Sequence, residues 1–161
     1  FLRKYLAQSE GYAVFGGEYA GHYVFNDGRG FGYDDGLYAA LRVLEYLSLK
    51  RCTLSEALAD YPERASTEDI YISTHQISPA LVLANVEKQS QHFQAEMSKI
   101  DGVRLDFEDG FGIIRASNTG EYFTVRFDAD SDQRLHQIRH NFVHMLTADY
   151  PQIAQDLLDA H

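Results

Sequence analysis

A glycine-rich stretch near the start of the chain holds the first side chains that could do chemistry. Gly16, Gly17 and Gly21 permit tight turns and a close approach of the backbone to a ligand. Among them stand Glu18, whose carboxylate can accept hydrogen bonds from two sugar hydroxyls, and His22, which can titrate near neutral pH. The spacing alone favours a plainer interpretation, a glycine-rich surface loop with a solvated carboxylate.

A second polar stretch lies about a hundred residues further along the chain. Arg115 offers a planar fork of N–H donors that suits phosphate, and Ser117, Asn118 and Thr119 add three side-chain donors. Gly120 lets backbone N–H groups turn inward and form the kind of concavity that holds anions. An ordinary Asn-Thr-Gly hairpin turn with its polar side chains in water fits the same residues equally well.

Short strands on either side are expected to position the glycine-rich stretch that holds Glu18 and His22. Aromatic-rich apolar runs at residues 12–15 and 22–25 predict two strands with a loop between them. Helices are expected at three places in this part of the chain: residues 1–9, 36–49 and 54–60. The polar stretch at residues 62–67 favours a domain boundary, so residues 1–62 form the first expected unit, of α/β type.

The second stretch belongs to a unit expected at residues 67–161. Strands are predicted at residues 69–73, 103–107, 112–116 and 122–127. Helices are predicted at residues 79–99, with Pro79 in the first turn, at 131–148, with Ser131 as the cap, and at 152–160. The expected fold class is α+β: a largely antiparallel four-stranded sheet packed by two helices, preceded by the α/β end of the first unit.

Composition excludes several classes of protein. The net charge of −10, from 24 acidic and 14 basic residues, argues against a nucleic-acid partner, which needs clustered lysine and arginine. Cys52 is the single cysteine, which excludes an intramolecular disulfide and argues against a cysteine-based zinc site. No apolar run approaches the roughly 20 residues needed to span a bilayer, so no membrane partner is expected, and the cytoplasm is the expected location. A few local donors can still bind a phosphorylated metabolite on an acidic protein.

Taken in this order, the two polar stretches resemble the alpha-D-phosphohexomutase superfamily, in its bacterial phosphomannomutase/phosphoglucomutase branch. The resemblance extends to residues 31–40 and 44–48 after the first loop, and to residues 101–104 and 114–119 around the second. It covers the chain up to about the last dozen residues. The motifs agree with the family in order, spacing and expected context.

The resemblance implies a function. Family members have four domains and interconvert hexose 1-phosphate and hexose 6-phosphate (mannose or glucose) through a phosphoserine and a bisphosphosugar, with Mg²⁺ bound in the second domain. By this resemblance residues 1–62 are the C-terminal part of the third, sugar-recognition domain, and residues 67–161 are the fourth, phosphate-binding domain. Glu18 would contact the sugar hydroxyls and His22 would carry a proton near the reacting phosphate. The expected clamp on the other phosphate is Arg115, Ser117, Asn118, Thr119 and Gly120.

The sequence contains neither a Ser-His-Asn nor an Asp-Gly-Asp motif, and it opens at Phe1 in a helix-like stretch. We therefore expect a C-terminal fragment, inactive by itself, whose catalytic phosphoserine and Mg²⁺ ligands lie in missing N-terminal domains of the same chain. Two departures from the family pattern are Ala20, where serine is usual, and Gly120-Glu121, where proline often follows the threonine.

Two alternatives remain open from the sequence: the phosphoglucosamine mutase branch, and a non-catalytic α+β module that binds phosphorylated ligands. His136, His140 and His144 are spaced four residues apart on a predicted helix, which could suit a metal. They lie opposite the apolar stripe of that helix, so we expect a solvated face and no metal site.

Overall fold

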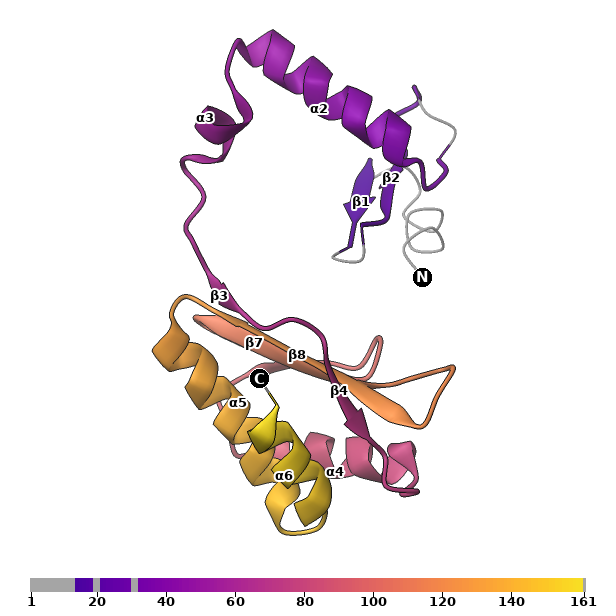
Figure 1. The fold of residues 1–161 in the computed structure, drawn as a ribbon, viewed down its shortest axis with the longest axis vertical. Coiled ribbons are helices and arrows are strands. Elements are labelled where there is room, and N and C mark those ends of the chain that lie inside the picture. The colour runs from indigo at the N-terminus through magenta and orange to yellow at the C-terminus, as the bar shows by residue number, and fades with distance from the viewer. Residues whose placement is uncertain (1–13, 19–20, 30–31, 161) are drawn as a thin grey trace. The chain divides into compact units, whose positions relative to one another are not determined.

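The computed structural model describes residues 14–18, 21–29 and 32–160, and the chain divides into two units, Phe1–Pro62 and Glu63–His161 (Figure 1). The helix predicted at residues 1–9 lies outside the described residues. Each unit is described by itself.

The first unit contains a short antiparallel hairpin, β1 (Phe15–Gly17) and β2 (Tyr23–Phe25), in which Gly16 lies opposite Val24. The sequence placed the first strand at 12–15 and began the loop at Gly16, so β1 lies further along the chain than predicted. Aromatic packing explains the difference. A Cβ on Gly17 would lie 3.0 Å from the Tyr23 ring, so the missing side chain lets that ring cover the strand.

Two helices follow in this unit, α2 (Gly36–Lys50) and α3 (Leu54–Leu58). α2 begins where the Asp35 carboxylate accepts a hydrogen bond from the backbone N–H of Tyr38, at 3.0 Å. The Tyr38 ring then packs edge-on against Phe25 of β2, at 5.3 Å between ring centres. No residue of α2 is buried, and Val24 is the only buried hydrophobic among the described residues of this unit. The described part therefore has little core of its own.

The second unit is built on one antiparallel sheet of six strands. Their bounds are β3 (Ala65–Ser66), β4 (Ile70–Ser73), β5 (Glu96–Ser98), β6 (Val103–Phe107), β7 (Gly110–Ala116) and β8 (Tyr122–Ala129). The order is β3-β8-β7-β6-β5, and β4 pairs with β8 beside β3. The α+β class with an antiparallel sheet is confirmed, but the predicted count of four strands is too low, because β3 and β5 were missed.

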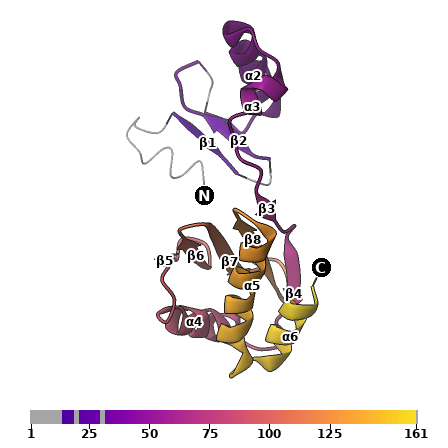
Figure 2. The same ribbon diagram turned by 90° about the vertical axis from the view of Figure 1, so that its left-hand side faces the viewer.

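Three helices cover one face of this sheet: α4 (Pro79–Ser90), α5 (Asp132–Thr147) and α6 (Pro151–Asp159). In Figure 2, α5 lies between α4 and α6. α5 begins as predicted at Ser131, whose hydroxyl accepts a hydrogen bond from the Arg134 N–H at 3.3 Å. The fold thus has three packing helices, one more than the two in the expected fold class.

The helix predicted at residues 79–99 ends at Ser90, which corrects the prediction by nine residues. The Ser90 hydroxyl donates to the Glu87 carbonyl, and the N–H of Phe93 donates to the Ser90 carbonyl at 2.9 Å, so the chain leaves the helix in a tight turn. β5 then pairs with the edge of β6, with Met97 opposite Leu105. Pairing across the sheet outweighs the helix-forming composition of this segment.

The core lies between the sheet and the helices. Alternate residues of β8 enter it, and Phe127 packs edge-on against Phe142 of α5 with 5.3 Å between ring centres. Gly112 of β7 makes room for that pair, since a Cβ there would lie 2.4 Å from the Phe142 ring. The other face of the sheet is not covered by these helices, and on it Arg115 lies opposite Thr124 in the strand register.

Part of the predicted boundary belongs to this unit. Ala65 and Ser66 form β3 and pair with the end of β8. Arg64 just before them binds Asp128, with 2.5 Å from its Nε to the carboxylate, and also Asp130. The second unit therefore begins within the polar stretch at residues 62–67, which the sequence indicated as the domain boundary.

Candidate functional site

The turn between β1 and β2 brings Glu18 and His22 together. The Gly21 N–H donates to the Glu18 carbonyl at 3.0 Å, and Gly21 has a φ of +85°, a conformation that glycine adopts without strain. His22 Nε2 lies 3.8 Å from Glu18 Oε1. Both side chains are about half exposed, at 49% for Glu18 and 56% for His22, so a ligand could reach them. Ala20, one of the departures noted above, lies outside the described residues.

Asp34 completes this cluster. Its carboxylate forms a hydrogen bond with His22 Nδ1 and accepts another from the backbone N–H of Tyr23, at 3.2 Å. With Nδ1 bound to Asp34, Nε2 is the imidazole nitrogen on the side of Glu18. The next residue, Asp35, has a different role, because it caps α2. Asp34 is twelve residues from His22, and no local pattern signals that pairing.

The second polar stretch forms the tight turn between β7 and β8. The Ser117 N–H donates to the Tyr122 carbonyl at 2.9 Å and closes the hairpin. The Ser117 Oγ accepts hydrogen bonds from the N–H groups of Thr119 and Gly120, both at 3.1 Å. The stretch is therefore a hairpin turn, and its backbone N–H groups at Thr119 and Gly120 are directed to Ser117.

Four of the five residues predicted for a phosphate clamp line one cavity of about 280 Å³, which we call the turn cavity. They are Arg115, Ser117, Asn118 and Thr119, and the other lining residues are Tyr71, Asp101, Ala116, Tyr122 and Thr124. The fifth, Gly120, is not among the residues that line the cavity. A Cβ on it would lie 2.5 Å from the Tyr122 ring, so the glycine makes room for that ring.

The turn cavity contains opposing charges. Arg115 is 47% exposed, and its Nη1 lies 3.2 Å from Oδ2 of Asp101, a residue that sequence reasoning did not assign to the site. Hydrogen bonds from the side chains of Ser117 and Thr119 hold the pKa of the Tyr122 phenol below its usual value, and the Arg115 charge acts in the same direction. The cavity thus combines a guanidinium and several hydroxyls with one carboxylate that competes for the guanidinium.

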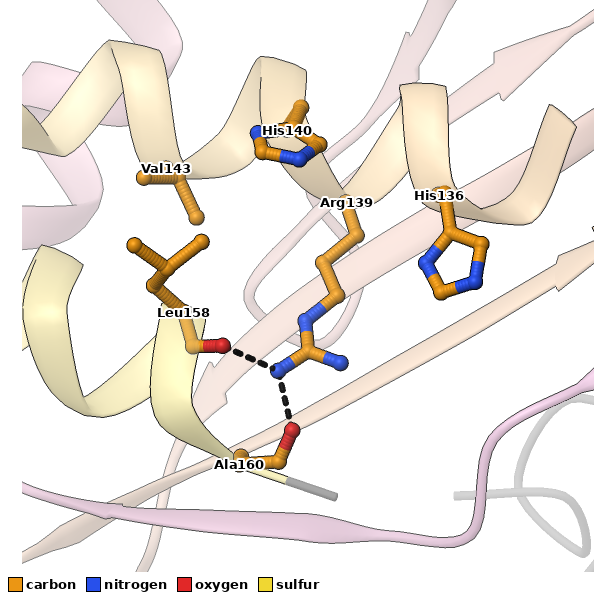
Figure 3. Close-up of a pocket in the computed structure, with 6 residues that line it drawn as sticks. All are labelled: His136, Arg139, His140, Val143, Leu158 and Ala160. Carbon is orange, nitrogen blue, oxygen red and sulfur yellow. Dashed lines mark hydrogen bonds between the residues drawn. The ribbon is translucent and has the colours of Figure 1, made fainter. Parts of the chain in front are cut away.

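The histidines of α5 belong to a different surface. His136 and His140 line a second cavity on either side of Arg139, which points between them to the end of α6 (Figure 3). There the Arg139 guanidinium donates to the backbone carbonyls of Leu157 and Leu158, at 2.6 and 3.0 Å. These bonds satisfy the last carbonyls of α6, so this feature stabilises the helix end.

Neither a metal cluster nor a membrane span is found within the described ranges. No group of three or more His, Cys, Asp or Glu side chains there could hold a metal ion. Nor is any helix of that part of the chain long and apolar enough to cross a bilayer.

Comparison with known proteins gives consistent matches. Residues 2–65 match the family model described as phosphoglucomutase/phosphomannomutase, alpha/beta/alpha domain III, and residues 77–145 match that of the C-terminal domain. The phosphomannomutase/phosphoglucomutase of Pseudomonas syringae pv. tomato is 35% identical over 90% of this chain and 30% of its own length. The phosphoglucomutase of Neisseria gonorrhoeae is 39% identical over 81% of this chain and 28% of its own length.

A solved structure agrees. A phosphoglucomutase/phosphomannomutase family protein from Burkholderia thailandensis superposes with a TM-score of 0.78 and 32% identity, over 94% of this chain and 31% of that protein. The chain thus spans about 30% of the length of the relatives it matches.

Proposed function

The chain belongs to the phosphoglucomutase/phosphomannomutase family, and from that premise we propose that its two units are the sugar-recognition and phosphate-binding parts of a hexose phosphate mutase. Such an enzyme interconverts hexose 1-phosphate and hexose 6-phosphate of glucose or mannose through a phosphoserine and a bisphosphosugar. Mg²⁺ assists by neutralising charge on the transferred phosphoryl group. Its ligands would belong to the second domain of the family, whereas this chain matches domain III and the C-terminal domain.

The cluster in the first unit would recognise the sugar. The Glu18 carboxylate is an acceptor for hydroxyl groups, and it is half exposed beside His22. With Asp34 at Nδ1, the other imidazole nitrogen, Nε2 on the side of Glu18, would give or take a proton near the reacting phosphate. In this proposal Asp34 is a positioning residue, because it acts through the imidazole.

The turn cavity in the second unit would hold the phosphate that is not reacting. The observation that carries this assignment is that Arg115, Ser117, Asn118 and Thr119 line one cavity on the face of the sheet that the helices do not cover. A guanidinium can form two parallel hydrogen bonds with phosphate, and the three side chains supply further donors. These four side chains would contact the phosphate and not a particular face of the sugar ring. A bisphosphosugar could therefore bind to them in either of its two orientations.

The test is a binding titration of the ¹⁵N-labelled chain with glucose 1-phosphate, glucose 6-phosphate and inorganic phosphate, followed by NMR. We expect the amide signals of residues 115–120 to shift with all three ligands. Arg115→Ala should raise Kd by about 10- to 100-fold, since hydrogen bonds to charged groups contribute about 1.5–3 kcal/mol. Arg115→Lys should recover only part of the loss, because an ammonium does not reproduce the planar fork.

Arg104 provides the matched control. It is an arginine of the same sheet, stacked over Phe111 at 3.7 Å and bound to Asp106, and Arg104→Ala should leave Kd within about twofold. Equal losses in the Arg104 and Arg115 variants would show that only general charge attracts the anion, and would overturn the clamp. In a full-length mutase containing this chain, Arg115→Ala should lower kcat/KM by a similar factor in both directions.

The same experiments separate the alternatives. The isolated chain should show no mutase turnover, and clear turnover by the pure chain would refute the proposed division of roles. A full-length enzyme that prefers glucosamine phosphates would place the protein in the phosphoglucosamine branch. Phosphate binding by a full-length protein without any turnover would favour a non-catalytic module.

A further inference from the structure

Tyr122 lines the turn cavity, but neither the sequence motif nor the proposed clamp includes it. It is the first residue of β8, directly after the turn, and its neighbour Phe123 is fully buried in the core. Because successive side chains of a strand alternate between faces, Tyr122 projects from the face that the helices leave uncovered. This is also the face that carries Arg115.

Two neighbours fix the Tyr122 ring. On one side, Tyr71 of β4 packs against it edge-on, with 5.5 Å between ring centres and 76° between ring planes. The backbone of Gly120 also lies against the ring, since any Cβ there would be 2.5 Å from Tyr122 Cε1 and 2.9 Å from Cδ1. The ring is thus positioned by packing before any ligand arrives, which lowers the entropy cost of using its hydroxyl.

Tyr122 lines the same cavity as the proposed clamp residues. Side-chain hydrogen bonds from Ser117 and Thr119 and the charge of Arg115 all act on its phenol, and together they favour the ionised form. A phosphate in the cavity has only acceptor oxygens when it is fully ionised, whereas the phenol O–H can donate. A hydroxyl held beside the other donors can therefore join them.

We propose that Tyr122 is a further ligand-binding residue of the turn cavity and that its hydroxyl donates a hydrogen bond to the bound phosphate beside Arg115 and Ser117. The inference rests on the proposed function, because it presupposes that the cavity binds phosphate. It also explains why glycine stands at position 120. A side chain at position 120 would displace the Tyr122 ring, and with it the hydroxyl that is the fifth proposed side-chain donor to the phosphate.

The experiment titrates the ¹⁵N-labelled full chain with inorganic phosphate and compares wild type, Tyr122→Phe and Tyr150→Phe. Tyr122→Phe keeps the ring and removes only the hydroxyl, and we expect Kd to rise about tenfold or more, as for loss of a hydrogen bond to a charged group. Tyr150 packs against the core and does not line the turn cavity, so Tyr150→Phe should leave Kd within about twofold. An unchanged Kd in Tyr122→Phe, or equal losses in both variants, would overturn the assignment.

A second measurement separates binding from packing. With ¹³Cζ-labelled tyrosine, the Tyr122 signal is identified by its absence in Tyr122→Phe, and its shift reports ionisation of the phenol. Bound phosphate should raise the pKa of Tyr122, because it is a negative charge that needs the protonated hydroxyl. A pKa that phosphate does not move would overturn the proposal.

The two proposals fail in distinguishable ways. If wild type shows no phosphate-dependent shifts at residues 115–120, the proposed function fails. If wild type binds and Arg115→Ala weakens binding while Tyr122→Phe does not, only the assignment of Tyr122 fails.

Discussion

Replacing Asp101 by asparagine should make the turn cavity bind phosphate more tightly. The Asp101 carboxylate lies 3.2 Å from the Arg115 guanidinium and so competes with any anion for it. Asparagine keeps the size and a hydrogen-bond acceptor but removes the charge. The variant therefore tests whether Asp101 opposes the ligand or helps to orient Arg115.

The size of the expected gain in phosphate affinity follows from the exposure of Asp101 and Arg115 and from the charge of the ligand. With the side chains 47% and 61% exposed, the Asp101–Arg115 ion pair contributes about 0.2–1 kcal/mol, which phosphate binding must offset. A dianion about 6 Å from the carboxylate adds a repulsion of about 1.4 kcal/mol in water, before screening by salt. Removing both costs should strengthen binding by about 1–2 kcal/mol, or lower Kd about five- to thirtyfold. Stability should change by less than about 1 kcal/mol.

The assay is the phosphate titration at two salt concentrations. Screening acts over about 10 Å at 0.1 M salt and about 3 Å at 1 M, so the gain in Asp101→Asn should shrink at high salt. Glu108→Gln is the matched control, since Glu108 is an exposed carboxylate beyond the far end of β7 from Arg115. It should change Kd by less than about twofold. Weaker binding in Asp101→Asn would refute the reasoning and would mean that Asp101 holds Arg115 in place for the ligand.

Three further predictions concern the second unit. Residues 63–161 alone should unfold cooperatively in urea, because every buried hydrophobic side chain among the described residues except Val24 lies there; a non-cooperative transition would contradict this. Residues 67–161 should be about 1–2 kcal/mol less stable, since they lack the β3 pairing and the Arg64 ion pairs. Gly112→Ala should lower the free energy of unfolding by about 1–3 kcal/mol, because the new methyl group would lie 2.4 Å from the Phe142 ring; a loss under about 0.5 kcal/mol would mean that the ring moves freely.

Much of the fold could be predicted because its signals are local. β6 occupies 103–107 as predicted, since its alternating apolar residues need only one buried face. α5 begins at its serine cap, a signal contained within four residues. β5 could not be predicted in this way. Residues 96–98 have a helix-like composition, and they form a strand only because the edge of β6 is available.

In the candidate site, too, some residues have a local signal in the sequence and others depend on contacts with distant residues. Arg115, Ser117, Asn118 and Thr119 are nearly consecutive, so their common cavity follows from one turn. Asp34 and Asp101 lie twelve and fourteen residues from the side chains they bind, and each resembles an ordinary surface acid in the sequence. Tyr122 is close in sequence, but its position depends on packing against Tyr71, which comes from another strand.

The arrangement of β8 places two features of the second unit far apart. Its last residues pair with β3, whereas its first residue stands at the turn cavity. The strand has eight residues, so the cavity lies about 25 Å from the pairing with β3. Substitutions more than about 10 Å apart usually have additive effects. The Arg64 ion pairs and the residues of the turn cavity can therefore be changed independently, one set to alter stability and the other to alter ligand binding.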